Sequence, residues 1–108
     1  MDVPQMTPLQ ALVVNILFEG ELSSRRIQDE MDFLGVAMKM PLVYRLLGRL
    51  EMAEYIYGCY RQYQTPDGRT IRERHYRVSE TGLKAWQETV AFYQKMLPPP
   101  DHFGHSLA

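Results

Sequence analysis

The sequence predicts a mainly α-helical fold with a small β-hairpin, an α+β architecture of the winged helix-turn-helix type. Apolar residues recur at helical spacing in three successive segments between residues 7 and 53. Two stretches rich in tyrosine and other strand-favouring residues follow, at 55–63 and 70–78, on either side of a Pro-Asp-Gly turn. A further helical segment begins near residue 80. The expected order is therefore three helices, a two-stranded wing and a C-terminal helix.

Each of the first two helices has a capping residue and an apolar face. Thr7 can cap the first helix, with Pro8 at its first position, and Ser23 or Ser24 can cap the second. The apolar face of the first helix is formed by Leu9, Leu12, Val13, Ile16 and Leu17, and that of the second by Ile27, Met31 and Leu34. Both helices are therefore expected to contribute to one hydrophobic core.

The third helix is predicted over residues 41–53, with Tyr44, Leu47 and Leu50 turned inward and Val43 at the edge of the core. Leu42, Arg45 and Arg49 are spaced by three and four residues, so they share the outer side, with Lys39 near the start of the helix. Gly48 lies in mid-helix, where glycine costs about 1 kcal/mol relative to alanine. A second backbone passing closely would explain that glycine.

The hairpin and the last helix complete the expected domain. The turn is Thr65-Pro66-Asp67-Gly68, and Ser79 stands where the cap of the last helix belongs. That helix is predicted over about 80–97, with Leu83, Trp86, Val90 and Tyr93 along one side, and a run of three prolines ends it. The expected organisation is a flexible N-terminus over 1–6, a winged-helix domain over 7–97 and a flexible tail over 98–108.

Size and composition are those of one ordinary globular domain. The chain has 108 residues, of which 45% are hydrophobic and 23% charged. No apolar run reaches the ~18 residues of a membrane span, and a secretion signal is not recognisable, so a cytoplasmic location is expected. Cys59 is the single cysteine, which precludes an internal disulfide and fits a reducing compartment.

Basic residues are concentrated in the middle of the chain, although the net charge is only −1. Residues 1–38 carry two basic and six acidic groups, whereas residues 39–77 carry eight basic and four acidic groups. All but one of those eight are arginines, whose planar guanidinium suits phosphates and guanine edges. This separation of charge predicts a polyanionic partner.

Two motifs flank the first strand of the hairpin and its turn. They are Val43-Tyr44-Arg45-x-Leu47-x-x-Leu50-Glu51 and His75-Tyr76-Arg77-Val78-Ser79-x-x-Gly82. In order and spacing they resemble the PadR-like transcriptional regulators, and the similarity extends from residue 7 to about 96. The resemblance implies a winged-helix fold, DNA binding and a homodimer formed through the last helix. Glu54 stands where the family often has glycine, so it must accept an unfavourable backbone angle or end the helix differently.

The third helix and the wing are the expected DNA-binding surfaces. The candidates are Lys39, Leu42, Arg45 and Arg49 on the helix, and Arg69, Arg72 and Arg74 on the wing. The helix would meet base edges in the major groove, and the wing would contact phosphates or the minor groove. The alternative is a solvated helix face and charges that protect a strand edge. For Leu42, contact with a thymine methyl group and partial burial against the core both stay open.

Under the resemblance, the last helix supplies the dimer interface through Leu83, Trp86, Val90 and Tyr93. Helical spacing does not separate a dimer role for Trp86 from a core role. A pocket for a small-molecule effector between the first and last helices, lined by Trp86 and methionines, is a further option that sequence leaves open.

The sequence thus predicts a sequence-specific, double-stranded DNA-binding transcriptional regulator that acts as a homodimeric repressor. The alternative is a winged-helix adaptor that binds protein without binding DNA, with the acidic first third as its docking face. Neither enzymatic activity nor a cofactor is expected, because we find no nucleophile beside a base, phosphate-binding loop or recognisably spaced carboxylate pair. His102 and His105 have the spacing of a weak metal pair, but a flexible tail without a metal is the preferred interpretation.

Overall fold

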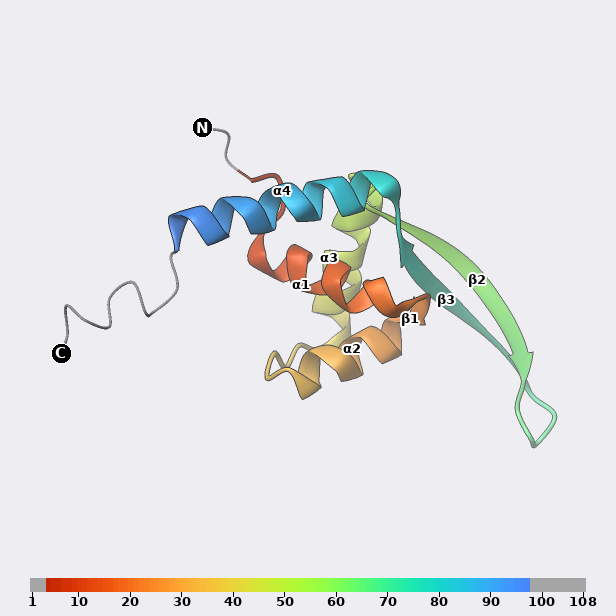
Figure 1. Ribbon diagram of the computed structural model, residues 1–108. Coiled ribbons are helices and arrows are strands. Elements are labelled where there is room, and N and C mark those ends of the chain that lie inside the picture. Colours follow the sequence, from red (N-terminus) through yellow and green to blue (C-terminus); the bar gives the residue numbers. More distant parts are fainter. Residues whose placement is uncertain (1–3, 98–108) are drawn as a thin grey trace.

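The structure is a computed structural model and describes residues 4–97. Its elements are α1 (Pro8–Ile16), the 3-10 turn η1 (Leu17–Glu19), β1 (Leu22–Ser23), α2 (Ser24–Phe33), α3 (Met40–Met52), β2 (Ile56–Gln64), β3 (Thr70–Val78) and α4 (Glu80–Met96). The first three helices cluster together, α4 runs across them, and the β2–β3 hairpin projects to one side (Figure 1). The predicted α+β winged-helix architecture is confirmed. None of the helices in residues 4–97 is long and apolar enough to cross a membrane.

The hairpin belongs to a three-stranded antiparallel sheet with the order β1-β3-β2. Its two long strands pair from Ile56 opposite Val78 to Gln64 opposite Thr70. Strand β1 was not predicted, because two residues are too few to show an alternating pattern. It pairs Leu22 with Tyr76 and leads directly into α2, so it fixes the helical unit to the base of the wing.

Side-chain caps start three of the helices where the sequence predicts them. Thr7 Oγ1 accepts a hydrogen bond from the Gln10 amide at 3.2 Å, and Gln10 Oε1 accepts one from the Thr7 amide at 3.0 Å. Ser23 Oγ accepts from the Arg26 amide at 3.2 Å, which identifies Ser23 as the cap of α2. Ser79 caps α4 in the same way. These bonds satisfy amide groups that each helix would otherwise leave unpaired.

The hydrophobic core confirms most of the predicted inward positions and corrects several. The buried apolar residues are Met6, Val13, Val14, Ile16, Leu17, Ile27, Met31, Val43, Leu47, Leu50, Tyr55, Ile56, Tyr76 and Ala85. The inward positions predicted for Leu9 and Leu34 were wrong, since both lie at helix ends and are 41% and 52% exposed. Met6 lies within the segment expected to be flexible, and Gln5 beside it accepts a hydrogen bond from the Tyr55 hydroxyl at 2.9 Å.

The inward face of α3 differs from the predicted one at two adjacent positions, Val43 and Tyr44. Val43 is fully buried, whereas Tyr44 is 53% exposed and lies on the side of α3 that faces the wing. Leu47 and Leu50 are buried as predicted. The physical reason is that a buried tyrosine hydroxyl needs a partner, whereas Val43 fills the same depth without a polar atom. Tyr44 is thereby available at the surface.

Two unusual positions, Gly48 within α3 and Glu54 just beyond its end, were singled out from the sequence. Glu54 has φ of 62°, so it accepts the unfavourable angle, as one of the two predicted alternatives stated. The Tyr55 amide donates to the Leu50 carbonyl and the Glu54 amide donates to the Glu51 carbonyl, which together form a Schellman motif. The close backbone approach expected at Gly48 was wrong, because a Cβ atom there would have no neighbour within 4 Å. No packing within residues 4–97 explains the glycine.

Helix α4 packs on the core through small residues. Gly82, Ala85 and Thr89 are its buried positions, and α1 is its main helical neighbour. The apolar side that helical spacing predicts lies next to these buried positions on the helix. There Leu83 is 41% exposed, and Trp86, Val90 and Tyr93 are half-buried. Trp86 meets Phe18 edge to face, with ring centroids 4.7 Å apart. The predicted tail, with His102 and His105, lies outside the described residues.

Candidate nucleic-acid interface

The outer side of α3 brings together three of its four predicted DNA-contact residues. Leu42, Arg45 and Arg49 line an apolar groove of about 440 Å³ between α3 and the start of α1. Both arginines are exposed, and within residues 4–97 neither has a carboxylate within ion-pairing distance. Lys39 occupies the N-cap position and lines a separate hollow beside the end of α2. The helix thus presents two free guanidinium groups and an exposed leucine.

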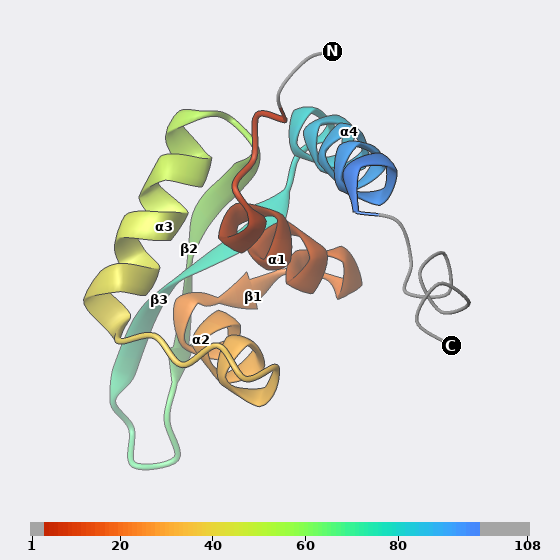
Figure 2. The same cartoon turned by 90° about the vertical axis from the view of Figure 1, so that its left-hand side faces the viewer.

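On its other side, α3 faces the hairpin across a second groove, of about 510 Å³. Its lining includes Tyr44 of α3, Arg25 at the start of α2, and Tyr60, Arg72 and Arg74 of the hairpin. The hairpin extends beyond the N-terminal start of α3 (Figure 2). The helix is therefore a ridge with a groove along each side, and exposed arginines lie in both.

Sequence reasoning missed two residues of the second groove. Tyr44 was placed in the core, and Arg25 was placed on the solvated side of α2. Arg25 lies beside the sheet because the first turn of α2 leads directly out of β1, and since β1 could not be predicted, the sequence held no signal for this placement. For Tyr44 the signal was its hydroxyl group, which favours a surface position over a sealed core.

The three predicted wing arginines occupy three different environments. Arg69 pairs with Asp67 inside the turn, with Nε 3.0 Å from Oδ2 and both side chains exposed. Arg72 stacks its guanidinium on the Tyr60 ring, 4.0 Å from the centroid, and has no carboxylate partner within residues 4–97. Arg74 pairs with Glu51 of α3, with Nη2 2.6 Å from Oε2. Arg72 and Arg74 share the face of the hairpin that is turned towards α3.

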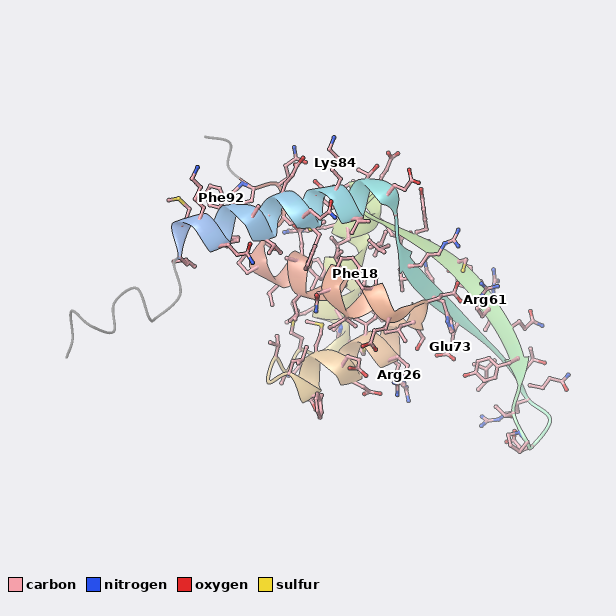
Figure 3. All side chains as sticks on the ribbon, in the orientation of Figure 1. Phe18, Arg26, Arg61, Glu73, Lys84 and Phe92 are labelled. Carbon is pink, nitrogen blue, oxygen red and sulfur yellow. The ribbon has the colours of Figure 1, made fainter. Side chains whose placement is uncertain are left out.

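The opposite face of the hairpin carries a separate polar cluster around Glu21, the residue just before β1. Arg61 donates two hydrogen bonds of 2.8 Å to the Glu21 carboxylate, and these lower the pKa of Glu21 to about 2. Cys59 Sγ donates to the same carboxylate at 3.5 Å, and His75 Nδ1 lies 3.6 Å from it. Figure 3 shows Arg61 projecting from the hairpin. The cluster links β1 to the wing, and its ion pair with Glu21 neutralises Arg61.

The described residues show no grouping of three or more histidine, cysteine or acidic side chains able to hold a metal ion. This surface offers a ligand the cationic groups that flank α3. They are Arg25 and Arg72 on one side and Arg45 and Arg49 on the other. Their spacing around an exposed helix suits an extended polyanion.

Comparison with solved structures identifies the fold. No family model matches the chain, and no curated protein matches it. A PadR family transcription regulator from Clostridium difficile R20291 superposes with a TM-score of 0.73 at 18% identity, over 94% of this chain and all of that one. A protein from Streptococcus mutans UA159 gives 0.73 at 19% identity, over 97% of this chain and 94% of that one.

The third comparison is with a structure that contains a nucleic acid. Bacillus subtilis PadR, solved in complex with operator DNA, gives a TM-score of 0.64 at 21% identity over 78% of this chain. This chain spans 47% of that protein's length. The resemblance in the sequence motifs is thus confirmed in three dimensions, and the chain has the PadR-like winged-helix fold.

Proposed function

We propose that this protein is a cytoplasmic regulator of transcription that binds double-stranded DNA in a sequence-specific manner. The observation that carries the proposal is the exposed ridge of α3, with arginines free of carboxylate partners within residues 4–97 in the groove on each side. A relative with the same fold, Bacillus subtilis PadR, was solved with operator DNA. Phosphate charge dominates the affinity of such surfaces, so binding should weaken steeply with salt.

The proposed contacts divide between base edges and backbone. Leu42, Arg45 and Arg49, together with Lys39 at the start of the helix, enter the major groove, where arginine can bind guanine with two hydrogen bonds. Arg69 and Arg72 on the wing bind flanking phosphates. Exposure of Leu42, at 45%, leaves its side chain free to meet a thymine methyl group.

Removing both helix arginines tests this proposal. Arg45→Ala with Arg49→Ala should cost several kcal/mol of binding to a site selected from random duplexes, about 1–3 kcal/mol for each base contact. The matched control is Lys84→Ala with Lys95→Ala, which removes the same charge from α4. Titration of labelled duplex at one salt concentration compares the variants. If the arginine double variant binds the selected site as tightly as the parent, α3 does not read the sequence.

A homodimer formed through α4 is the second part of the proposal. Leu83, Trp86, Val90 and Tyr93 form the half-exposed apolar flank of this helix, and a second copy would cover it. Two α3 helices would then enter successive major grooves about 34 Å apart and exclude other proteins from the site, which is the basis of a repressor. Leu83→Glu should shift the sedimenting species from dimer to monomer while the fold persists. A parent protein that sediments as a monomer at every concentration contradicts the dimer.

A further inference from the structure

Arg74 forms an ion pair that Arg72, two residues earlier on the same face, does not form within residues 4–97. Its Nη2 lies 2.6 Å from Glu51 Oε2 and its Nε lies 3.4 Å from Oε1, so one edge of the guanidinium meets both oxygens of the carboxylate. The two side chains are 32% and 27% exposed. Its guanidinium also lies 5.1 Å from the Tyr60 ring centroid. The pair joins strand β3 to the last turn of α3.

Gly58 provides the space for this guanidinium. A Cβ atom at Gly58 would lie 2.5 Å from Arg74 Nη2, 2.6 Å from Nε and 2.7 Å from Cζ. Glycine weakens a strand interior, and in such a place it often marks a close approach by another group. Here the group is the arginine side chain from the neighbouring strand, lying flat across β2 on its way to α3.

The base of the wing is also fastened to the end of α3 through Ser79. Its hydroxyl donates to the Glu54 carbonyl at 2.6 Å, and its amide donates to the Tyr55 carbonyl at 3.0 Å. These bonds hold the base of the hairpin, and β1 links β3 to α2 through Leu22 opposite Tyr76 and Ser23 opposite His75. The Glu51–Arg74 pair lies farther out along the ribbon, five residues before Ser79, and adds a direct restraint between the wing and α3.

We propose that Glu51, Arg74 and Gly58 form a clamp that sets the angle between α3 and the wing, and that Arg74 positions the wing rather than contacting DNA. Arg72, which has no carboxylate partner within residues 4–97, is then the strand's phosphate-binding cation. This division of roles rests on the proposed DNA-binding function. It replaces, for Arg74, the direct DNA contact expected from sequence.

The clamp is tested first without DNA, by a double-mutant cycle on urea unfolding with Arg74→Gln and Glu51→Gln. The two changes should be coupled by about fivefold in the unfolding equilibrium constant, the upper end for an ion pair with this much exposure. The control cycle, Arg72→Gln with Glu51→Gln, should be additive. Coupling below twofold for the first cycle, or equal coupling in both cycles, overturns the clamp.

Gly58→Ala gives an independent check on the same geometry. The methyl group should carry a penalty in the parent protein, because it displaces the guanidinium from Glu51, and this penalty acts against the gain that alanine brings to a strand interior. In the Arg74→Gln background that penalty should vanish, because the shorter side chain leaves the notch empty. An equal loss of stability in both backgrounds would show that Gly58 serves some purpose other than seating Arg74.

The role in DNA binding is tested by the salt dependence of binding to random-sequence duplex. Arg72→Gln should reduce the slope of log K against log salt by about 0.9, as expected for one lost phosphate contact. Arg74→Gln should lower affinity without changing this slope, and its effect should be much smaller in the Glu51→Gln background. A slope reduced by about 0.9 in Arg74→Gln would identify a direct phosphate contact and overturn the positioning role.

Failure of the clamp and failure of the proposed function give different results. If the parent protein does not bind duplex DNA at all, the proposed function fails, while the unfolding cycle still decides whether the clamp exists. If the parent binds and Arg74→Gln behaves like Arg72→Gln, the function stands and the positioning role fails.

Discussion

Gly82→Ala should be strongly destabilising even though alanine is the better helix former. A Cβ atom at Gly82 would lie 2.0 Å from the Tyr55 carbonyl oxygen and 2.8 Å from its carbonyl carbon. Ordinary contact begins at 3.4 Å, and both neighbours are backbone atoms that no rotamer change can move. To restore ordinary contact, the first turn of α4 and the backbone at Tyr55, just before β2, would have to move apart by more than about 1 Å.

The expected loss follows from the contacts that this separation breaks. Crowding of a packed site costs about 1–3 kcal/mol. The Tyr55 carbonyl accepts from the Ser79 amide at 3.0 Å, and Ser79 Oγ accepts from the Gly82 amide at 2.9 Å, so two hydrogen bonds are weakened at about 1 kcal/mol each. Alanine returns about 1 kcal/mol of helix propensity. The net destabilisation should be about 2–4 kcal/mol.

Urea unfolding followed by circular dichroism measures the difference, with Gly48→Ala as the matched control. A Cβ atom at Gly48 meets nothing within 4 Å, so the same substitution should stabilise the protein by about 0.5–1 kcal/mol. The two variants are predicted to change stability in opposite directions. If Gly82→Ala is as stable as the parent or more so, the close packing of α4 on Tyr55 is not a feature of the folded protein.

Three further changes are expected to alter stability in defined ways. Glu54→Gly should raise the free energy of unfolding by about 1 kcal/mol, because φ of 62° strains a residue with a Cβ; unchanged stability in urea would refute this. Thr7→Ala should lower it by about 1 kcal/mol through loss of the capping box, measured in the same way. Folding lowers the pKa of Glu21 from 4.5 to about 2, so the stabilisation that the ionised carboxylate contributes is present above pH 4.5 and is lost as pH falls towards 2. Glu21→Gln should therefore flatten the dependence of the free energy of unfolding on pH in that window, and an unaltered dependence would refute this.

The local features of this fold could be predicted from sequence because their causes are local. Thr7, Ser23 and Ser79 cap helices through bonds to amides three residues away, and a Pro-Asp-Gly turn joins two strands of matched length. Glu54 was recognised as unusual through the family resemblance, because the PadR-like regulators often have glycine after this helix. None of these inferences required knowledge of the remote part of the chain.

The features that could not be predicted depend on contacts between distant segments. Arg74 meets Glu51 across 23 residues, so no spacing rule links them, and Gly58 has no visible reason until that guanidinium is placed over it. The helical period admits either Val43 or Tyr44 as an inward residue, so periodicity alone could not predict that Val43 is buried and Tyr44 exposed.

The candidate interface illustrates the same division. The concentration of arginines between residues 39 and 77 indicated a polyanionic partner, but the sequence could not show which of them are neutralised. Arg61 and Arg74 are held by Glu21 and Glu51, while Arg45 has no such partner within residues 4–97. Only the folded arrangement separates cations that fasten the wing from those that a ligand can reach.

Binding of the full chain to random-sequence duplex DNA across a salt series, with sedimentation in the same buffer, tests the central claim most directly. The proposed function predicts tight binding at ~50 mM salt that weakens steeply as salt rises, by a protein that sediments as a dimer. No binding at ~50 mM salt, where contacts to phosphates are strong, would contradict DNA binding and favour an adaptor that docks on protein.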